Sequence, residues 1–209
     1  MLQLEIPLVI TDSDLSTGSG LVTISITDGK IPEFDSIEST AVNELGLLDA
    51  ADNDSGGYAV SESSDSLLPP EPDKDLFDAL GLERAGSAIT LASEVDDNGW
   101  WQARDEGDTL VFQFRFNPSA SDWDVRFRKA LDHPDVQGAN TLDIDIPVRI
   151  GDIDGDLSAL SSFTVTVTDD IPVDVDYSFD FVEGASISKK LLSDGQAGAD
   201  RGNVTEVQY

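Results

Sequence analysis

The stretch that decides the fold is residues 144–172, which read IDIPVRIGDIDGDLSALSSFTVTVTDDIP. A related stretch, residues 4–32, reads LEIPLVITDSDLSTGSGLVTISITDGKIP. Both open and close on Ile-Pro, and each pair of matching prolines or isoleucines is 140 residues apart: Ile6 with Ile146 and Ile31 with Ile171. Two matched boundaries at one spacing, with Asp-x-Asp between them, indicate an internal repeat.

The repeat divides the chain into three parts. Residues 1–32 are interpreted as the C-terminal part of a preceding repeat, 33–172 as a complete repeat, and 173–209 as the N-terminal part of a following one. A fainter match beyond the closing Ile-Pro supports this division, since Val42-Asn43-Glu44 resembles Val182-Glu183-Gly184. The sequence therefore predicts a piece of a longer tandem array, cut out of register with its repeats.

Strand patterns dominate the complete repeat. Apolar and polar residues alternate in Leu21–Thr27, Leu142–Pro147 and Phe163–Thr168, with the period and the β-branched residues of half-buried strands. Thr109–Phe116 and Trp123–Arg128 alternate too, and the turn residues between them predict a hairpin. Helical signal is weak and confined to 74–82. We therefore expect an all-β chain built from antiparallel β-sandwich repeats.

Composition limits the possible partners. Asp plus Glu is 42 and Lys plus Arg is 12, which gives a net charge of −30. Nucleic acid and membrane insertion are not expected, because phosphate binding needs clustered basic residues and the apolar runs are too short to span a bilayer. The charge has two interpretations, disorder or a fold neutralised by bound cations. Alternating apolar residues favour the fold, and a chain without cysteine has no disulfides to stabilise it.

Alternating aspartates mark the first candidate cation site, at Asp152, Asp154 and Asp156, with a shorter counterpart at Asp12 and Asp14. They offer several hard oxygens on a tight turn, which suits Ca²⁺ better than Mg²⁺. The alternative is a solvated acidic turn. A second candidate lies at the junction between repeats, where Asp169 and Asp170 are followed by Asp174. Here the alternative is a polar linker.

Three further features each have more than one interpretation. Asp132 precedes the one histidine, His133, and either caps backbone amides in a structural turn or ligates calcium; no nucleophile accompanies the pair, so an enzyme is not expected. Residues 49–75 are rich in Asp, Ser, Gly and Pro and are interpreted as a mobile or calcium-ordered loop. Trp100 and Trp101 should point to opposite faces of a strand, so that one is buried and the other is a possible ligand contact.

At these residues the chain resembles the type I secretion repeats of giant RTX adhesins, which include biofilm-associated proteins. The resemblance rests on Leu131-Asp132-His133, Asn140-Thr141-Leu142 leading into Ile146-Pro147, the turn Asp152–Asp156, and the closing Val165–Pro172. It covers 105–209 well and 1–32 moderately, whereas 35–104 is atypical and matches by position alone.

The resemblance implies an Ig-like or cadherin-like sandwich with calcium at the linkers, export through a type I system, and an extracellular or cell-surface location. It implies a structural module that extends an adhesin used for attachment and biofilm formation, with neighbouring repeats as partners. The alternative is a module that binds a surface peptide or glycan, in which 35–104 and the paired tryptophans hold the ligand.

Overall fold

The structure is a computed structural model of the 209-residue chain. It describes residues 2–27, 29–48, 52–61, 65–134 and 138–171, together with Ser178, Asp180, Glu183 and Gly184. Within these ranges the regular secondary structure is mostly β-strand, with little helix, as the alternating sequence predicts. No helix in the described ranges has the length and apolar character needed to cross a bilayer.

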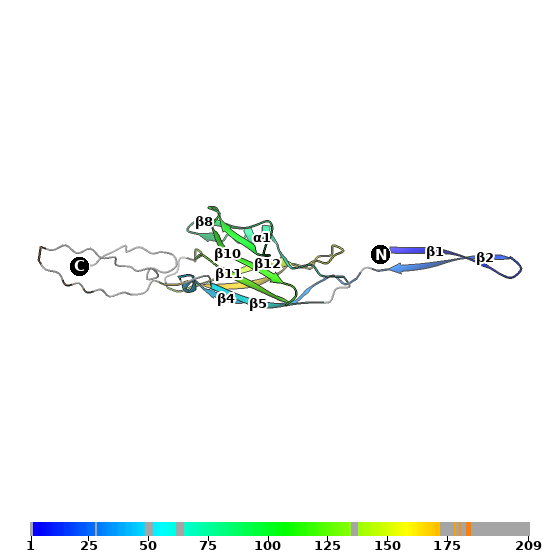
Figure 1. Cartoon of the computed structure of the whole chain (residues 1–209), viewed down its shortest axis with the longest axis horizontal. Coiled ribbons are helices and arrows are strands. Elements are labelled where there is room, and N and C mark those ends of the chain that lie inside the picture. The colour runs from blue at the N-terminus through cyan, green and yellow to red at the C-terminus, as the bar shows by residue number, and fades with distance from the viewer. Residues whose placement is uncertain are drawn as a thin grey trace.

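The described strands form three sheets (Figure 1). The first is a hairpin of β1 (Leu2–Thr11) and β2 (Thr17–Ile26). The large sheet has the order β3-β5-β11-β10-β9-β8-β7, with bounds Phe34–Ile37, Asp52–Val60, Asp122–Phe127, Leu110–Asn117, Trp101–Asp105, Ser87–Leu91 and Glu83–Arg84. The small sheet has the order β4-β13-β12-β6, with bounds Thr40–Asn43, Ser161–Thr168, Thr141–Arg149 and Glu71–Pro72.

The large and small sheets pack on each other and form the body of the protein. Trp123 of the large sheet lies with its ring centroid 4.2 Å from that of Phe163 in the small sheet, and both side chains are buried. Phe114 contacts Phe163 edge-on at 5.8 Å. Their neighbours Ile144, Ile146 and Val165 belong to the same buried cluster. The body therefore has one apolar core between two sheets, and the antiparallel pairing predicted for it holds except that β13 pairs with β4 in parallel.

Gly56 is needed where it stands because Trp123 lies directly against it. The two residues are partners across the β5–β11 pairing. A Cβ at position 56 would lie 2.8 Å from the indole ring, closer than real side chains approach. The large sheet therefore accommodates its largest core side chain by omitting the side chain opposite it.

Two short helices complete the body. The α-helix α1 (Lys74–Asp78) begins at Asp73, whose carboxylate accepts the Leu76 N–H at 3.2 Å. Its Phe77 is buried against Phe112, with ring centroids 6.0 Å apart. The 3₁₀ helix η1 (Glu44–Leu48) follows β4. The predicted helix over 74–82 is thus confirmed, but it ends at Asp78.

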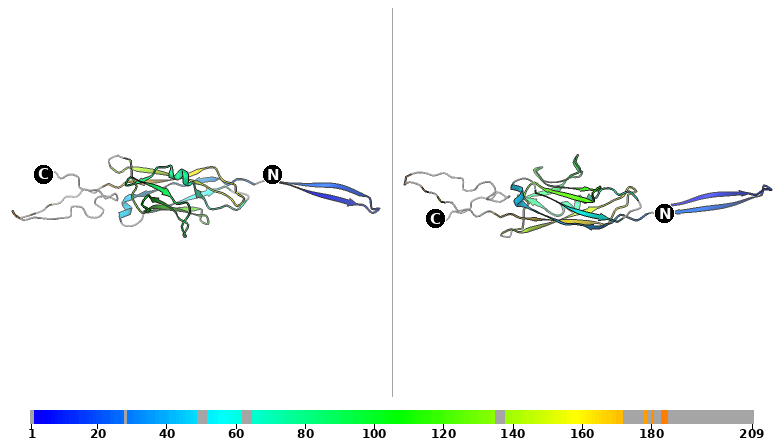
Figure 2. Two further views of the ribbon diagram at one scale, coloured as in Figure 1. Left: turned by 90° about the horizontal axis from the view of Figure 1, so that it is seen from above. Right: turned by 60° about the horizontal axis from the view of Figure 1, so that its bottom comes forward.

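The hairpin of β1 and β2 lies beyond one end of the body in both Figures 1 and 2. Its pairing resembles that of β12 and β13 with the register offset by one residue: Ile6 pairs with Val22, 16 positions on, whereas Ile146 pairs with Phe163, 17 positions on. The burial differs, however. Ile6 and Val22 are 39% and 40% exposed, whereas Ile146 and Phe163 are 0% and 1% exposed. The hairpin has the pattern of a core sheet without a second sheet against it.

Two sequence expectations are wrong. Residues 49–75 are not one loop, because β5 and β6 lie within them, and β5 pairs with both β3 and β11 inside the large sheet. The strand predicted over Leu21–Thr27 exists as part of β2, but it is exposed on both faces instead of half-buried. The predicted hairpin of β10 and β11 is confirmed, with Phe112, Phe114, Trp123, Val125 and Phe127 all buried.

The contrast between the two hairpins predicts unequal costs of truncation. Phe163→Ala should lower the free energy of unfolding of the body by about 3–5 kcal/mol, because it leaves a cavity between the sheets. Val22→Ala, at the matching position of the exposed hairpin, should change it by less than about 0.5 kcal/mol. Denaturant unfolding followed by tryptophan fluorescence measures both, since all three tryptophans lie in the body. A comparable loss in Val22→Ala would mean that the hairpin face is covered in solution.

Candidate metal centres

A carboxylate cluster occupies one end of the body, which we call the proximal end. Asp65, Asp152 and Asp154 each place a carboxylate oxygen within 4.8 Å of the other two. Asp152 is 2% exposed, whereas Asp154 is exposed. Asp152 and Asp154 come from the turn between β12 and β13, and Asp65 comes from the segment that follows β5. Three hard oxygens from two segments are the start of a Ca²⁺ coordination sphere.

Backbone contacts hold the two segments of this cluster together. Ile153 donates its N–H to the Ser66 carbonyl at 3.1 Å, and Leu68 donates to the Gly151 carbonyl at 2.8 Å. Within the turn, the Asp156 N–H donates to Asp152 Oδ1 at 2.9 Å. Gly155 adopts a φ of +102°, which an L-residue rarely does. Asp156 thus shapes the turn through its backbone and is not one of the three grouped carboxylates.

The charges in the cluster oppose one another. The hydrogen bond with the Asp152 carboxyl, followed by partial loss of solvent and the negative charge of Asp152, raises the pKa of Asp154 to about 6. Asp65 adds a smaller effect of the same sign. A carboxyl that retains a proton near pH 6 next to other carboxylates is in the electrostatic field that a divalent cation would neutralise.

The matching turn in the β1–β2 hairpin is simpler. Asp12 Oδ1 accepts the N–H groups of Asp14 and Ser16, at 3.1 and 2.9 Å, and Asp14 Oδ1 accepts the Ser16 N–H. These contacts lower the pKa of Asp14, the side chain of Asp12 contributing most. No third acidic residue among those described joins Asp12 and Asp14. The turn sequence alone therefore does not assemble a cluster, which in the body also needs Asp65.

The second cluster lies at the opposite, distal end of the body, where β13 ends. Glu44, His133 and Asp169 have ligand atoms within 4.8 Å of one another. The Leu131 N–H donates to Glu44 Oε1 at 2.8 Å, and Glu44 is 1% exposed. Asn140 donates from Nδ2 to Asp169 Oδ2 at 3.3 Å. The other oxygen, Asp169 Oδ1, is buried and accepts no hydrogen bond within the described part of the chain.

His133 has a defined orientation in this cluster. Because the Asn140 amide nitrogen donates to Asp169, its Oδ1 is the acceptor that faces His133 Nδ1 at 3.1 Å, so Nδ1 carries a hydrogen. Nε2 then faces Glu44 Oε1 at 3.3 Å. Nε2 and Glu44 Oε1 are therefore two ligand-type atoms that face each other in the cluster. The nitrogen suits a transition metal better than the calcium predicted for Asp169.

Two other predicted ligands, Asp132 and Asp170, lie outside both clusters. Asp132 accepts the Ala85 and Gly86 N–H groups, one on each carboxylate oxygen, at 2.6 and 2.7 Å. This is the capping role that the sequence analysis offered as the alternative to calcium, and it fastens the turn between β7 and β8. Asp170 is half-buried and is not grouped with the distal cluster. Asp174 lies outside the described residues.

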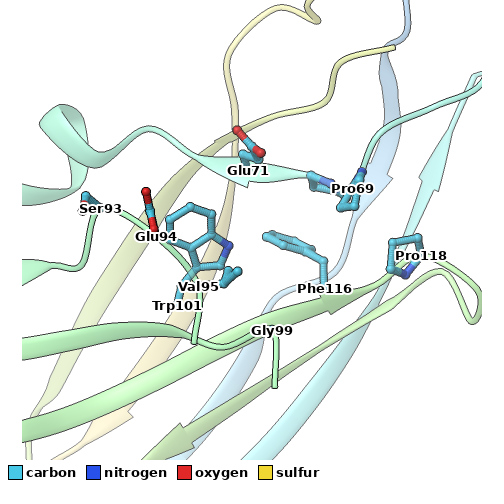
Figure 3. A pocket seen from close by; sticks show the side chains of 10 residues that line it. Pro69, Glu71, Ser93, Glu94, Val95, Gly99, Trp101, Phe116 and Pro118 are labelled. Carbon is cyan, nitrogen blue, oxygen red and sulfur yellow. The ribbon is translucent and has the colours of Figure 1, made fainter. Parts of the chain in front are cut away.

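The paired tryptophans occupy opposite faces of the large sheet, as expected. Trp100 is 4% exposed, and the guanidinium groups of Arg115 and Arg126 lie 4.6 and 4.4 Å from its ring centroid. Trp101 is half-buried on the inner face, where it lines an open cavity with Phe116 (Figure 3). Ligand binding by Trp100 would require displacing two arginines, whereas Trp101 is accessible from the cavity.

Two cluster members escaped the sequence analysis. Asp65 stands in a Ser-rich stretch, and nothing local connects it with Asp152, 87 positions further on. Glu44 was used as part of the repeat and was not predicted as a ligand. The signal that could have pointed to it was an acidic residue two positions after Val42, which the structure buries.

Comparison of the chain with family models, with curated proteins and with solved structures found no match in any of the three.

The raised pKa of Asp154 predicts a pH-dependent effect of Asp154→Asn that changes sign with calcium. Without calcium, the folded state favours protonated Asp154, so its stabilising contribution is present below about pH 4 and is lost as the pH rises through about 6. The variant should therefore become more stable relative to the parent across that range. With calcium at pH 7.5 it should be less stable, because a ligand is lost. Calorimetric melting temperatures at several pH values measure this, and a pH-independent difference would contradict it.

Proposed function

We propose that the chain is a calcium-stabilised structural module of a large, type I-secreted RTX adhesin, an Ig-like or cadherin-like sandwich that spaces and stiffens the protein outside the cell. The observation that carries the proposal is the meeting of Asp65 with Asp152 and Asp154 at the proximal end of the body. It gives the acidic turn of the repeat a set of oxygens that Ca²⁺ prefers.

The repeated hairpin supports the tandem part of the proposal. β1 and β2 share antiparallel pairing and an acidic turn with β12 and β13, with the register offset by one residue, and expose the face that β12 and β13 bury. A lone two-stranded hairpin is marginally stable in water. The exposed residues fit a second sheet packed on that face, equivalent to the large sheet of the body. Neighbouring repeats are then the natural partners.

The position of the carboxylate cluster supports a stiffening role. The chain leaves the β1–β2 hairpin and reaches the body at Glu33, whose N–H donates to Ser61 Oγ at 3.1 Å and whose carbonyl accepts the Ser61 N–H at 2.8 Å. Asp65 lies four positions beyond Ser61. An ion held by Asp65, Asp152 and Asp154 would fix the segment to which the incoming chain is bonded, and so restrict bending between repeats.

Extracellular calcium is abundant enough for a weak site. Extracellular modules of this kind bind with dissociation constants of roughly 10⁻⁴–10⁻³ M. When the free calcium concentration is 100 times the dissociation constant, one bound ion stabilises the folded state by about 2.7 kcal/mol. A domain of this size shifts its melting temperature by roughly 2–4 °C per kcal/mol, which predicts a change of about 5–10 °C.

Calorimetry in excess calcium and in chelator tests the proposal. The melting temperature of the parent should fall by about 5–10 °C in chelator. Asp65→Asn and Asp152→Asn should each remove most of the difference, since each removes a ligand. Asp97→Asn is the matched control, because it makes the same change of charge at an exposed residue outside both clusters.

Two outcomes would reject the calcium site. The first is a melting temperature that moves by no more than a few degrees between calcium and chelator. The second is a shift that persists in Asp65→Asn and Asp152→Asn, which would place the ion elsewhere. Magnesium in place of calcium should give little shift, because Mg²⁺ gives up its hydration water reluctantly.

A second candidate function, a ligand-binding module of the same kind of adhesin, is favoured by one observation. Trp101 lines an open cavity of about 520 Å³ that does not include the carboxylate cluster.

A further inference from the structure

The cavity next to Trp101 lies at the open margin of the body, between edge strand β6 of the small sheet and the inner face of the large sheet (Figure 3). Trp101 pairs with Phe114, so Trp101, Phe114 and Phe116 lie on the same face of the large sheet. Phe114 is covered by Phe163 of the small sheet, whereas Trp101 is only half-buried. The cavity is therefore core surface that the small sheet does not reach.

The walls of the cavity are poor in hydrogen-bond donors. Pro69 and Pro70 form one side and Pro118 closes one end, and proline has no backbone N–H. None of the described lining residues is Lys, Arg, Asn or Gln. Two carboxylates, Glu71 and Glu94, are exposed at the cavity, with Glu94 beside the Trp101 ring in Figure 3. A ligand that fits this site must bring donors and positive charge.

The wall formed by residues 93–99 is held in place before any ligand arrives. The Asp96 carboxylate accepts the Asn98 and Trp100 N–H groups at 2.8 and 3.0 Å and the Gln102 side chain at 3.0 Å. The Trp100 N–H bond is the main reason that the pKa of Asp96 lies below its usual range. A wall that is already ordered loses little conformational entropy on binding.

We propose that this cavity binds the cationic side chain of an extended peptide, an arginine above all, with the guanidinium over Trp101 and between Glu71 and Glu94. A planar guanidinium stacks on an indole and donates several hydrogen bonds to carboxylates. The same pairing exists inside the chain, where Arg115 and Arg126 lie over Trp100 on the opposite face of the sheet. A volume of about 520 Å³ is within the range of ligand cavities.

A neutral sugar fits the site less well. Stacking on Trp101 would suit a sugar ring, but its hydroxyl groups need donors as well as acceptors from the protein. The proline wall and the two carboxylates offer mostly acceptors, and among the described lining side chains only Ser93 and the Trp101 indole carry a donor. The proposal does not depend on the calcium site, since Asp65, Asp152 and Asp154 do not line the cavity.

Titration of the ¹⁵N-labelled full chain with the peptide acetyl-Gly-Gly-Arg-Gly-Gly-amide tests the proposal by NMR. We expect a dissociation constant of about 0.1–1 mM. Of the three indole N–H signals, that of Trp101 should move most, and Trp101→Phe assigns it. Peptides with Gln or Glu in place of Arg should not shift it. The titration is run in calcium and in chelator, and the shift should persist in both.

Matched variants separate the site from the overall charge of −30. The double variant Glu71→Gln/Glu94→Gln should weaken binding about five- to twentyfold, as the loss of two exposed ion pairs predicts. The control Glu5→Gln/Glu106→Gln makes the same change of net charge at exposed positions away from the cavity, and should change affinity less than twofold. All four positions are exposed, so the variants should remain folded.

Three outcomes would overturn the proposal. Equal weakening in both double variants would mean that the peptide is attracted by net charge alone. No movement of the Trp101 indole signal with the Arg peptide would mean that the cavity is not its site. Movement of that signal with maltose or another neutral sugar, and not with the peptide, would assign the cavity to a glycan. None of these outcomes bears on the calcium-dependent melting temperature, so failure of one proposal leaves the other intact.

Discussion

The contact on which the body depends is the packing of Trp123 against Phe163 between the two sheets. It joins β11 to β13, with ring centroids 4.2 Å apart, and Phe114 and Phe116 meet Phe163 edge-on at 5.8 Å each. Gly56 makes room for the indole in the neighbouring strand. Because the sheets are fixed to each other here, the turn after β12 and the segment after β5 reach the proximal end in a set relation. The carboxylates of both clusters owe their positions to this core.

Much of the acidic composition is explained by hydrogen bonds that build turns, and does not require bound cations. Several aspartates accept backbone N–H groups and so build turns: Asp96 organises the wall next to Trp101, Asp105 accepts the Thr109 N–H at 2.8 Å, and Asp132 fastens the β7–β8 turn. In a chain without disulfides, such caps replace covalent links between loops. Carboxylates that also lie against one another call for a cation, and among the described residues Asp65, Asp152 and Asp154 are grouped in this way.

Alternation of apolar and polar residues predicted the strands that carry the core, because a strand with one buried face imposes a period of two. The alternation pattern did not predict the strand at 52–60, because its Asp, Ser and Gly residues are typical of a loop. The reason is physical: Gly56 is selected by the indole of Trp123, and the Asp52 and Asp54 carboxylates accept hydrogen bonds from β4, so the strand has little apolar signal of its own. For a related reason, only part of the Asp65, Asp152 and Asp154 cluster could be predicted from the sequence. Asp152 and Asp154 are neighbours in sequence, whereas Asp65 joins them through the pairing of Leu67 with Asp152.

The two hairpins show why an acidic turn alone does not define a cation site. Asp12 and Asp14 have the spacing of Asp152 and Asp154, and Asp12 Oδ1 accepts the Ser16 N–H as Asp152 Oδ1 accepts the Asp156 N–H. Among the described residues, however, no third carboxylate joins Asp12 and Asp14. In the body, the segment after β5 adds Asp65 and, through Ser61, holds the chain that arrives at Glu33. A site completed in this way is formed only when both sheets of a unit are assembled. Ion binding would then report on, and favour, the assembled sandwich at the point where one repeat passes into the next.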